Sequence, residues 1–274
     1  MPELPEVETV KETLKRQILK QRINKVKILY KGIIKSNLSD FQEKIVGQEI
    51  IDIKRRGKWL ILELSNYYLV VHLRMEGKFF LKDENEEINK HEHVIFYLDK
   101  CTLRYHDTRK FGNMYLVLKE DLYTKTPLVK IGLEPWDENL TIDYLKNKYN
   151  KNIAIKTLLL DQEVISGIGN IYADEILFLS NINPTQKGHS LTNEQLENII
   201  KNTKITLEKA IKLGGTTIRS YTSSLGVTGR FQNELMVHQR ENETCYKCQS
   251  KIIKTKVNGR GTYYCPICQK ENTL

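Results

Sequence analysis

The sequence predicts a multidomain protein of the α+β class, in which a β-sandwich with a leading helix precedes a helical region and a small C-terminal ribbon. Short apolar runs alternate with polar turns between residues 23 and 118, which is typical of a sandwich. Past Pro135 the apolar residues recur at helical spacing, and four cysteines follow near the C-terminus. With 274 residues, the chain is long enough for more than one core. We expect domains at residues 1–134, 135–235 and 236–274.

The first helix is expected to begin near Pro5, because apolar residues recur behind it at steps of three and four: Val7, Val10, Leu14 and Ile18. If Met1 is removed, Pro2 carries a secondary amine near the positive end of this helix. That end disfavours protonation, so the amine stays reactive as a nucleophile. Glu3 beside it is a candidate acid and base. The alternative is an ordinary helix start with proline and glutamate in its first turn.

Seven strands are expected before the helical region, each a short apolar run bounded by polar turns: residues 26–30, 50–53, 59–64, 69–73, 78–81, 94–98 and 114–118. Cys101, in the stretch from Val94 to Leu103, is expected to be a buried strand thiol. Strands at this spacing favour a β-sandwich.

Four helices are expected next, at residues 142–149, 153–161, 171–180 and 193–213. Thr192 and Gln195 form a capping box for the last one, and Gly214-Gly215 ends it. The following stretch, residues 216–231, is rich in Gly, Ser and Thr and predicts a surface loop. The turn Ser166-Gly167-Ile168-Gly169-Asn170 opens the third helix and is a candidate phosphate clamp. A tight connection without a ligand is the alternative.

The four C-terminal cysteines have the spacing of a tetrahedral zinc site: Cys245-x2-Cys248 and Cys265-x2-Cys268. Four thiolate ligands leave no open coordination position, so one structural zinc ion is expected. Two disulfides in a secreted module are the alternative. Between the pairs, Asn258-Gly259-Arg260-Gly261 predicts a hairpin tip that projects Arg260.

The formal net charge is +9, which suits a polyanionic partner such as nucleic acid, although an acidic membrane or protein surface is also compatible with it. For the basic residues of the C-terminal ribbon, the alternative to binding a partner is a charged face that is only exposed to solvent. No apolar run approaches the ~20 residues of a membrane span, and the N-terminus is acidic and amphipathic, unlike a secretory signal. We therefore expect a cytoplasmic protein.

Six motifs lie in order along the whole chain: Pro2-Glu3-Leu4-Pro5-Glu6, Arg56-Gly57-Lys58-Trp59-Leu60, His72-Leu73-Arg74-Met75-Glu76-Gly77, Asp107-Thr108-Arg109-Lys110-Phe111-Gly112, Gly167-Ile168-Gly169-Asn170-Ile171-Tyr172-Ala173 and the four-cysteine ribbon. In sequence and spacing they resemble those of bacterial formamidopyrimidine-DNA glycosylase, also called 8-oxoguanine DNA glycosylase. The N-terminal motif is specific to that family.

The resemblance implies a β-sandwich with the amine on its leading helix, a helix–two-turn–helix domain and a C-terminal zinc finger, with double-stranded DNA bound in the cleft between. It implies a bifunctional DNA glycosylase and AP lyase that flips out and excises oxidised purines, 8-oxoguanine and formamidopyrimidines. Pro2 would attack C1′ to form an imine, Glu3 would shuttle protons, and β- and δ-elimination would cleave the strand. The enzyme is expected to be a monomer associated with the bacterial nucleoid through DNA.

The resemblance also assigns DNA contacts to individual residues. Lys58 and Arg260 would contact phosphates near the reacting sugar, and Lys58 would assist proton transfer. Three side chains would fill the space left by the flipped nucleotide: Met75, Arg109 and Phe111. For Met75 and Phe111 the alternative is core packing. The backbone contacts would come from His91, Lys151, Lys156 and Asn170.

One departure from the family pattern falls in Val237-His238-Gln239-Arg240, where the family commonly has a tyrosine, a glycine and a basic residue. The linker to the ribbon is therefore expected to differ. Two other functions stay open at this point. The sister branch, endonuclease VIII, acts on oxidised pyrimidines and shares Pro2 and Glu3, but usually has glycine in place of Leu4. A zinc-ribbon protein that binds DNA without chemistry would leave the N-terminal motif and Lys58 unexplained.

Overall fold

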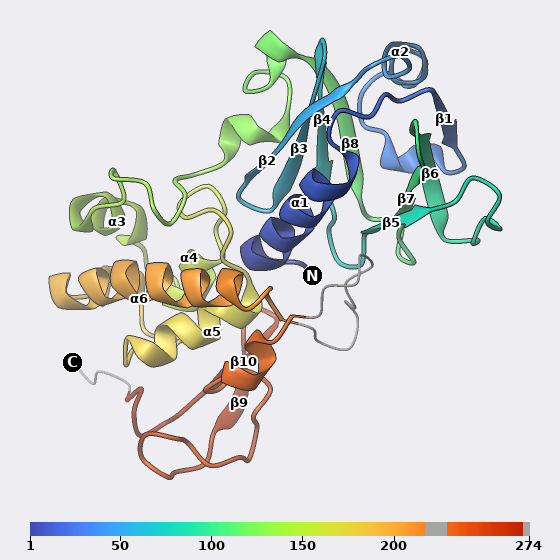
Figure 1. The fold of residues 1–274 in the computed structure, drawn as a ribbon. Helices are drawn as coiled ribbons and strands as arrows, with labels where there is room; N and C mark the ends of the chain where they lie inside the picture. The colour runs from blue at the N-terminus through green and yellow to red at the C-terminus, as the bar shows by residue number, and fades with distance from the viewer. Residues whose placement is uncertain (217–228, 271–274) are drawn as a thin grey trace. The chain divides into compact units, whose positions relative to one another are not determined.

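The computed structural model describes residues 1–216 and 229–270, which group into two compact units (Figure 1). The N-terminal unit contains residues 1–130 with the described residues between Gly214 and Gly229, and the C-terminal unit contains the remainder. The helical region and the four-cysteine segment thus share one unit. The division into three domains at residues 134 and 235 stays a prediction. The centre of the expected surface loop, residues 217–228, lies outside the described residues.

Helix α1, Leu4–Ile18, opens the N-terminal unit. Its apolar stripe is buried as predicted, and the helix lies against strand β2, Ile50–Arg56. Glu3 is the N-cap, and it forms a reciprocal capping box with Glu6 in which each side chain accepts the backbone N–H of the other residue. Pro5 lies in the first turn, where its missing N–H is not needed.

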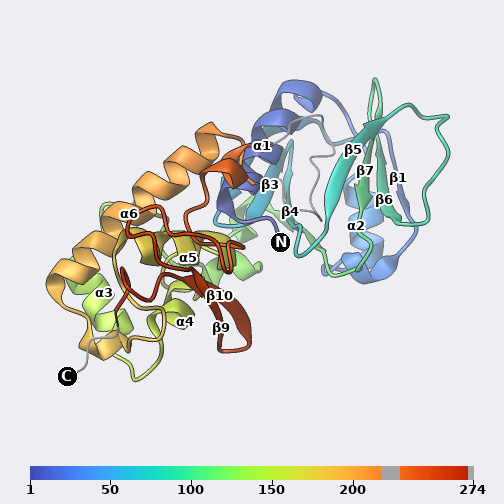
Figure 2. The same cartoon turned by 90° about the horizontal axis from the view of Figure 1, so that it is seen from below.

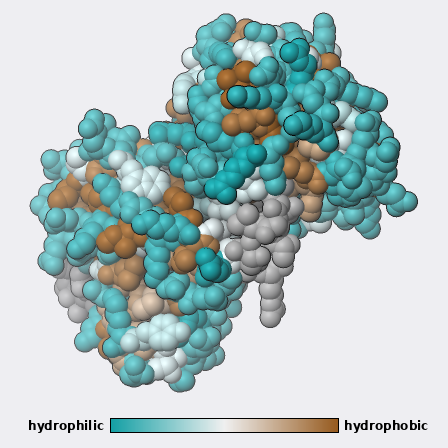
Figure 3. All heavy atoms as spheres, viewed as in Figure 1, coloured by the Kyte–Doolittle hydropathy of each residue, from teal (hydrophilic) through white to brown (hydrophobic). Residues whose placement is uncertain are grey.

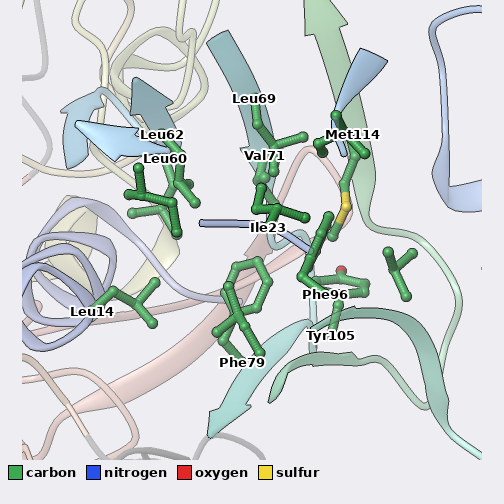
Figure 4. Close-up of a cluster of buried hydrophobic side chains, with 14 of the residues drawn as sticks. Leu14, Ile23, Leu60, Leu62, Leu69, Val71, Phe79, Phe96, Tyr105 and Met114 are labelled. Atoms are coloured by element: carbon green, nitrogen blue, oxygen red, sulfur yellow. The ribbon is translucent and has the colours of Figure 1, made fainter. Parts of the chain in front are cut away.

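Two four-stranded antiparallel sheets form the predicted sandwich, with strand orders β1-β6-β7-β5 and β2-β3-β4-β8 (Figures 1 and 2). Side chains from both sheets and from α1 share one hydrophobic core, and Figure 4 shows Leu14, Leu60, Phe79 and Phe96 in it. The remaining strands are β1 Lys25–Ile28, β3 Trp59–Leu64, β4 Tyr67–His72, β5 Lys78–Lys82, β6 Glu92–Tyr97, β7 Thr102–His106 and β8 Asn113–Leu118.

Strand β7 and the short helix α2, Leu38–Lys44, were not expected from the sequence. The sequence pattern did not indicate β7 because Arg104 places a charge in the middle of its short apolar run. Its guanidinium is buried and bonds the Glu92 carboxylate and the backbone carbonyls of Asp83, Glu86 and Glu87. Cys101 lies in the turn between β6 and β7 and is half-buried, so its expected place within a strand is wrong.

The C-terminal unit contains the four predicted helices and a β-hairpin. The capping box of Thr192 and Gln195 is confirmed at the start of the longest helix. The elements are α3 Ile142–Tyr149, α4 Ile155–Leu159, α5 Asn170–Leu179, α6 Asn193–Lys212, β9 Ile253–Val257 and β10 Arg260–Tyr264. Short 3₁₀ turns occur at Lys31–Ile33, Lys119–Asp121, Pro127–Lys130, Gly188–Ser190 and Phe231–Glu234.

The surface seen in Figure 3 is mostly hydrophilic, with scattered apolar side chains. Scattered exposed apolar residues are normal for a folded chain. Within residues 1–216 and 229–270, none of the helices combines the length and the apolar content of a membrane span.

Leu14→Ala is expected to lower the free energy of unfolding of the N-terminal unit by about 3 kcal/mol, because Leu14 is fully buried and its neighbours close the resulting cavity only in part. The exposed Gln17 on the same helix provides the control, and Gln17→Ala should change that free energy by less than about 0.5 kcal/mol. Urea unfolding followed by Trp59 fluorescence in a Trp136→Phe background measures both. Equal midpoints for the two variants would contradict the packing of α1.

Candidate functional site

Pro2 and Glu3 lie at the start of α1, where the sequence predicts them. Pro2 is buried, and Met1 before it is exposed. Glu3 is 2% exposed, and its backbone N–H donates to Oε2 of Glu6 at 2.8 Å. The pair therefore combines a nitrogen at the chain terminus, once Met1 is removed, with a fixed carboxylate.

Glu6 is a residue of this site that the sequence analysis missed. Its Oε1 accepts the backbone N–H of Thr216 at 2.7 Å and the Thr216 hydroxyl at 3.1 Å. Gly215 has φ +76°, and a Cβ on it would lie 2.6 Å from the same oxygen. Glu6 thus joins the start of α1 to the beginning of the segment predicted as a loop. The spacing Glu3-x-x-Glu6, which has the form of a capping box, was the available signal.

Lys58 lies in the two-residue turn that joins β2 to β3, and it is buried. Gly57 precedes it with φ 55°, a conformation that glycine adopts without strain. Arg55 connects this turn to α1, since its Nη1 donates to the Gly57 carbonyl at 3.1 Å and its Nε to Glu8 at 2.6 Å. The lysine is therefore held on a turn that is fixed to the helix of Pro2 and Glu3.

His72 ends β4 and was also missed by the sequence analysis. Burial and the positive charges of Arg74 and Lys58 lower the pKa of His72 to about 3, so its imidazole is neutral at physiological pH. Its Nδ1 accepts the Arg74 backbone N–H at 2.9 Å, which leaves the proton on Nε2. The site thus contains a neutral N–H donor, and the positive charge of Lys58 is one of the causes of its low pKa. The sequence signal for His72 was its place as the first residue of the motif that contains Met75.

Met75, Arg109 and Phe111 are on two loops of the N-terminal unit. The Met75 loop, residues 73–77, joins β4 to β5, and the Phe111 loop, residues 107–112, joins β7 to β8. The loops are neighbours, because His72 pairs with Asn113 and Lys78 pairs with His106 in the two sheets. Each loop therefore crosses from one sheet to the other at the same edge.

The exposure of the two apolar side chains excludes core packing in this structure. Met75 is 37% and Phe111 51% exposed. The guanidinium carbon of Arg109 lies 4.7 Å from the centroid of the Phe111 ring, within the range of a cation–π contact. His91 is half-buried just before β6, and its carbonyl accepts the Asp107 backbone N–H at 2.9 Å. The structure thus places His91 beside the Phe111 loop.

Arg260 is exposed at the first position of β10, next to the two-residue turn Asn258-Gly259. Both turn residues have positive φ, 47° and 74°, as such a hairpin requires. The predicted hairpin and the projection of Arg260 are confirmed. Asn170, the first residue of α5, donates from Nδ2 to the Gly261 carbonyl at 3.0 Å. Asn170 therefore lies against the same hairpin.

Lys156 requires a correction. We expected it at the DNA backbone, but it is fully buried within the C-terminal unit. Its ammonium lies 2.7 Å from Asp174 Oδ1 and donates to the Gly261 carbonyl at 3.0 Å and to the Thr262 hydroxyl at 2.8 Å. A buried cation needs this many partners, because the loss of water is costly. Lys156 therefore supports the hairpin of Arg260 from inside.

The linker to the ribbon is held by two acidic residues of α5. The Glu175 carboxylate accepts the backbone N–H groups of Met236, Val237 and His238 at 2.8, 3.0 and 2.9 Å. Burial raises the pKa of Glu175, while these three bonds favour its ionised form. Asp174 Oδ2 contacts His238 Nδ1 at 2.7 Å.

Gln239 explains the departure from the family pattern at the linker. It lies where the family commonly has glycine, and its φ of 62° is a left-handed conformation that glycine adopts more easily.

Lys151 is exposed between α3 and α4, as a surface contact requires. The glycine turn before α5 offers fewer free donors than we expected. The Gly167 N–H donates to Gln162 Oε1 at 2.9 Å, and Gln162 Nε2 donates to the Ile168 carbonyl at 2.8 Å. Gln162 thus fixes the turn, and the Gly167 N–H is not available to an anion.

The four cysteine sulfurs converge on one point in the C-terminal unit. All lie within 4.8 Å of one another, and the Sγ atoms of Cys248 and Cys265 are 3.4 Å apart and those of Cys245 and Cys268 3.9 Å. These separations exclude disulfide bonds, which need about 2.05 Å. Four sulfurs at about 2.3 Å from a central ion would be separated by about 3.8 Å in a tetrahedron. The cluster can therefore hold a metal ion, and it is compatible with a zinc ribbon.

Comparison with protein families gives two matches. Residues 1–114 match the formamidopyrimidine-DNA glycosylase N-terminal domain, and residues 131–222 match the formamidopyrimidine-DNA glycosylase H2TH domain. A formamidopyrimidine-DNA glycosylase of Bacillus cereus is 47% identical over 273 residues, covering 98% of this chain and 99% of that protein. One from Listeria monocytogenes is 43% identical, with 98% and 100% covered.

Solved structures of a Lactococcus lactis protein have the same fold. The G226P mutant of Lactococcus lactis FPG, in a complex with DNA containing Fapy-dG, superimposes with a TM-score of 0.94 at 38% identity. The complex of Lactococcus lactis Fpg with abasic-site DNA gives a TM-score of 0.93 at 38% identity. Each covers 98% of this chain and 100% of that chain.

His72→Gln is expected to make the stability of the N-terminal unit less sensitive to acid. The pKa of His72 is lowered from 6.5 to about 3 in the folded protein, so below pH 6.5 the unfolded chain binds a proton that the folded protein does not. Stability should therefore fall as the pH falls. Between pH 6.5 and about pH 5, the wild-type unit should lose about 1.5 kcal/mol more than the variant. Urea unfolding at both pH values measures this difference, and equal losses would contradict a neutral buried His72.

Proposed function

Because the chain belongs to the formamidopyrimidine-DNA glycosylase family, we propose that it excises oxidised purines, 8-oxoguanine and formamidopyrimidines, through an imine on Pro2. The protein is a DNA glycosylase with AP lyase activity that acts on damaged bases in DNA. The observation that carries the proposal is the arrangement at the start of α1, with Pro2 as the second residue and the buried Glu3 as N-cap.

In the proposed reaction the Pro2 nitrogen, freed by removal of Met1, attacks C1′ of the damaged nucleotide. The C1′–N bond to the base breaks, and the base leaves as an anion that takes a proton from water. Glu3 accepts the proton that the Pro2 nitrogen loses on bonding to C1′ and passes it to the sugar ring oxygen, so that the ring opens and the imine forms. The imine acidifies the hydrogens on C2′. Loss of one of them expels the 3′-phosphate by β-elimination, and δ-elimination then expels the 5′-phosphate.

Extrusion of the damaged nucleotide leaves a space in the duplex, and we assign its filling to Met75, Arg109 and Phe111. The exposure of Met75 and Phe111 supports this role, because the apolar groups are available for stacking between bases. Arg109, next to Phe111, offers a fork of donors to the unpaired base. Stacking and hydrogen bonding offset the few kcal/mol needed to unstack the nucleotide.

Phosphate contacts are assigned to the cations and donors of each unit. In the N-terminal unit these are Lys58 and His91, with the Nε2–H of His72 as a further donor. In the C-terminal unit they are Lys151, Asn170 and Arg260. Lys156 contributes through the hairpin that it supports. Such contacts position the duplex without reading its sequence.

The ion bound by Cys245, Cys248, Cys265 and Cys268 is proposed to be zinc. Four thiolates suit zinc, and they leave no vacancy for water or substrate, so the ion contributes folding free energy. The role of the cysteines is then to fix the base of the β9–β10 hairpin and thereby Arg260. A cytoplasmic location at the bacterial nucleoid and a monomeric state remain predictions.

The substrate class is decided by excision from two duplexes, one carrying 8-oxoguanine and the other thymine glycol. We expect rapid excision of 8-oxoguanine opposite cytosine and slow excision of thymine glycol. The reverse order would assign the chain the substrates of the sister branch, endonuclease VIII.

Pro2→Gly is expected to reduce base excision strongly while leaving some activity, because glycine keeps a terminal amine that is primary and more mobile. Borohydride reduction of enzyme mixed with abasic DNA should trap a covalent adduct on Pro2 of the wild type and much less of it in the variant. Peptide mapping by mass spectrometry locates the adduct. An undiminished adduct that maps to a lysine such as Lys58 would remove Pro2 from the mechanism. Glu3→Gln should abolish excision and leave lesion binding measurable.

Cys248→Ser is expected to unfold the ribbon and weaken the binding of abasic duplex at least tenfold, because a structural zinc site supplies on the order of 10 kcal/mol to its fold. The half-buried Cys101 gives the control, since Cys101→Ser should keep both metal and affinity. Metal content is measured with a chromophoric chelator and DNA affinity by fluorescence anisotropy. Tight DNA binding by a metal-free protein would show that the ribbon is not part of the binding surface.

A further inference from the structure

We propose that Tyr105 is a positioning residue for nucleotide extrusion, and that it couples the Met75 loop to the Phe111 loop. The inference rests on the proposed role of Met75, Arg109 and Phe111 in filling the space left in the duplex. Tyr105 lies in β7 and is fully buried, so it acts through the two loops and not by touching DNA.

The Tyr105 hydroxyl lies between the last residues of the two loops. A Cβ on Gly77, at the end of the Met75 loop, would lie 2.3 Å from the hydroxyl oxygen. A Cβ on Gly112, at the end of the Phe111 loop, would lie 1.7 Å from the same oxygen. Both distances are far below van der Waals contact, so each loop can approach the hydroxyl this closely only with glycine at that position.

Asp107 connects the hydroxyl to the backbone of the Phe111 loop. The Tyr105 hydroxyl donates to Asp107 Oδ2 at 3.3 Å. The same carboxylate accepts the backbone N–H groups of Arg109, Phe111 and Gly112, each at 2.9 Å. The other end of Tyr105 is fixed in the core, where its ring packs against Phe79 with centroids 5.4 Å apart (Figure 4). The side chain thus joins the core to the loop that carries Arg109 and Phe111.

A left-handed residue precedes each exposed apolar side chain. Arg74, before Met75, has φ 55°, and Lys110, before Phe111, has φ 58°. This conformation is unfavourable for residues other than glycine by about 1–2 kcal/mol, so surrounding contacts must maintain it. Thr108 of the Phe111 loop also donates a hydrogen bond to Glu76 of the Met75 loop. The loops therefore present their side chains as one preorganised unit, which reduces the entropy lost on insertion.

The test uses Tyr105→Phe, which removes only the hydroxyl. Single-turnover AP lyase cleavage is measured on one abasic oligonucleotide, either paired opposite cytosine in a duplex or as a single strand. The duplex leaves a space to be filled, and the single strand does not. We expect the duplex rate to fall roughly tenfold, as for a lost hydrogen bond to a charged group, and the single-strand rate to change less than about twofold.

Tyr149→Phe is the matched control, because Tyr149 is fully buried and its hydroxyl has no hydrogen-bond partner among the residues that the structure describes. It should leave both rates unchanged. Gly112→Ala, which pushes the Phe111 loop away from the hydroxyl, should reproduce the selective loss with a larger amplitude. If Tyr105→Phe lowers both rates equally, or neither, the coupling role is overturned.

Phe111→Ala separates this inference from the proposed function. It should show the same selective loss on the duplex. If Phe111→Ala leaves the duplex rate unchanged, the proposed filling of the space is wrong, and the role of Tyr105 is wrong with it. If Phe111→Ala is selective and Tyr105→Phe is not, only the coupling is wrong. Both measurements use abasic DNA, so neither depends on which oxidised base the enzyme prefers.

Discussion

A buried carboxylate must be satisfied by hydrogen-bond donors, and this requirement organises the loops that carry the site. Asp107 accepts three backbone N–H groups of the Phe111 loop, and Glu175 accepts three from the linker to the ribbon. Glu6 accepts two backbone N–H groups, those of Glu3 and Thr216. An unsatisfied buried carboxylate is costly, so each loop has one favoured arrangement. Rigid elements thereby hold side chains that ordinary loops would leave mobile.

The C-terminal unit applies the same requirement to a buried cation. Lys156 and Asp174 form an ion pair without access to water. The ammonium donates further hydrogen bonds to the Gly261 carbonyl and the Thr262 hydroxyl of the hairpin. Such a pair adds little net stability against an apolar replacement, but removal of one partner is strongly destabilising. Its geometric effect is to fix one side of the β9–β10 hairpin, while the cysteines fix the other end of the ribbon. Arg260 is thus supported from two sides, by a fully buried ion pair and by the partly buried cysteine cluster.

Local signals in the sequence predicted most of the fold. Helices α3 and α6 follow from their periodicity, α6 from its capping box as well, and the hairpin follows from Asn258-Gly259. Strand β7 could not be predicted in this way, because Arg104 is satisfied by carbonyls that are distant in sequence. The burial of Lys156 depends on Asp174 and on residues more than a hundred positions away. The candidate residues were found as motifs. Glu6 and Asp107 belong to two of these motifs, but the pattern does not show which backbone N–H groups their carboxylates accept. Glu175 lies outside the residues assigned to the site and bonds a linker that is distant in sequence.

The burial of Pro2 also has a consequence for the order of events during synthesis. The amine required by the proposed chemistry exists only after Met1 is cleaved, yet Pro2 is buried and the backbone of Glu3 is bonded to Glu6. An aminopeptidase needs an extended chain end in its own active site. Because N-terminal regions fold first as the chain leaves the ribosome, trimming has to precede the docking of α1 on its sheet. In the proposed chemistry, removal of Met1 therefore competes with the docking of α1 on its sheet, and a chain that docks first would keep Met1 and lack the Pro2 amine.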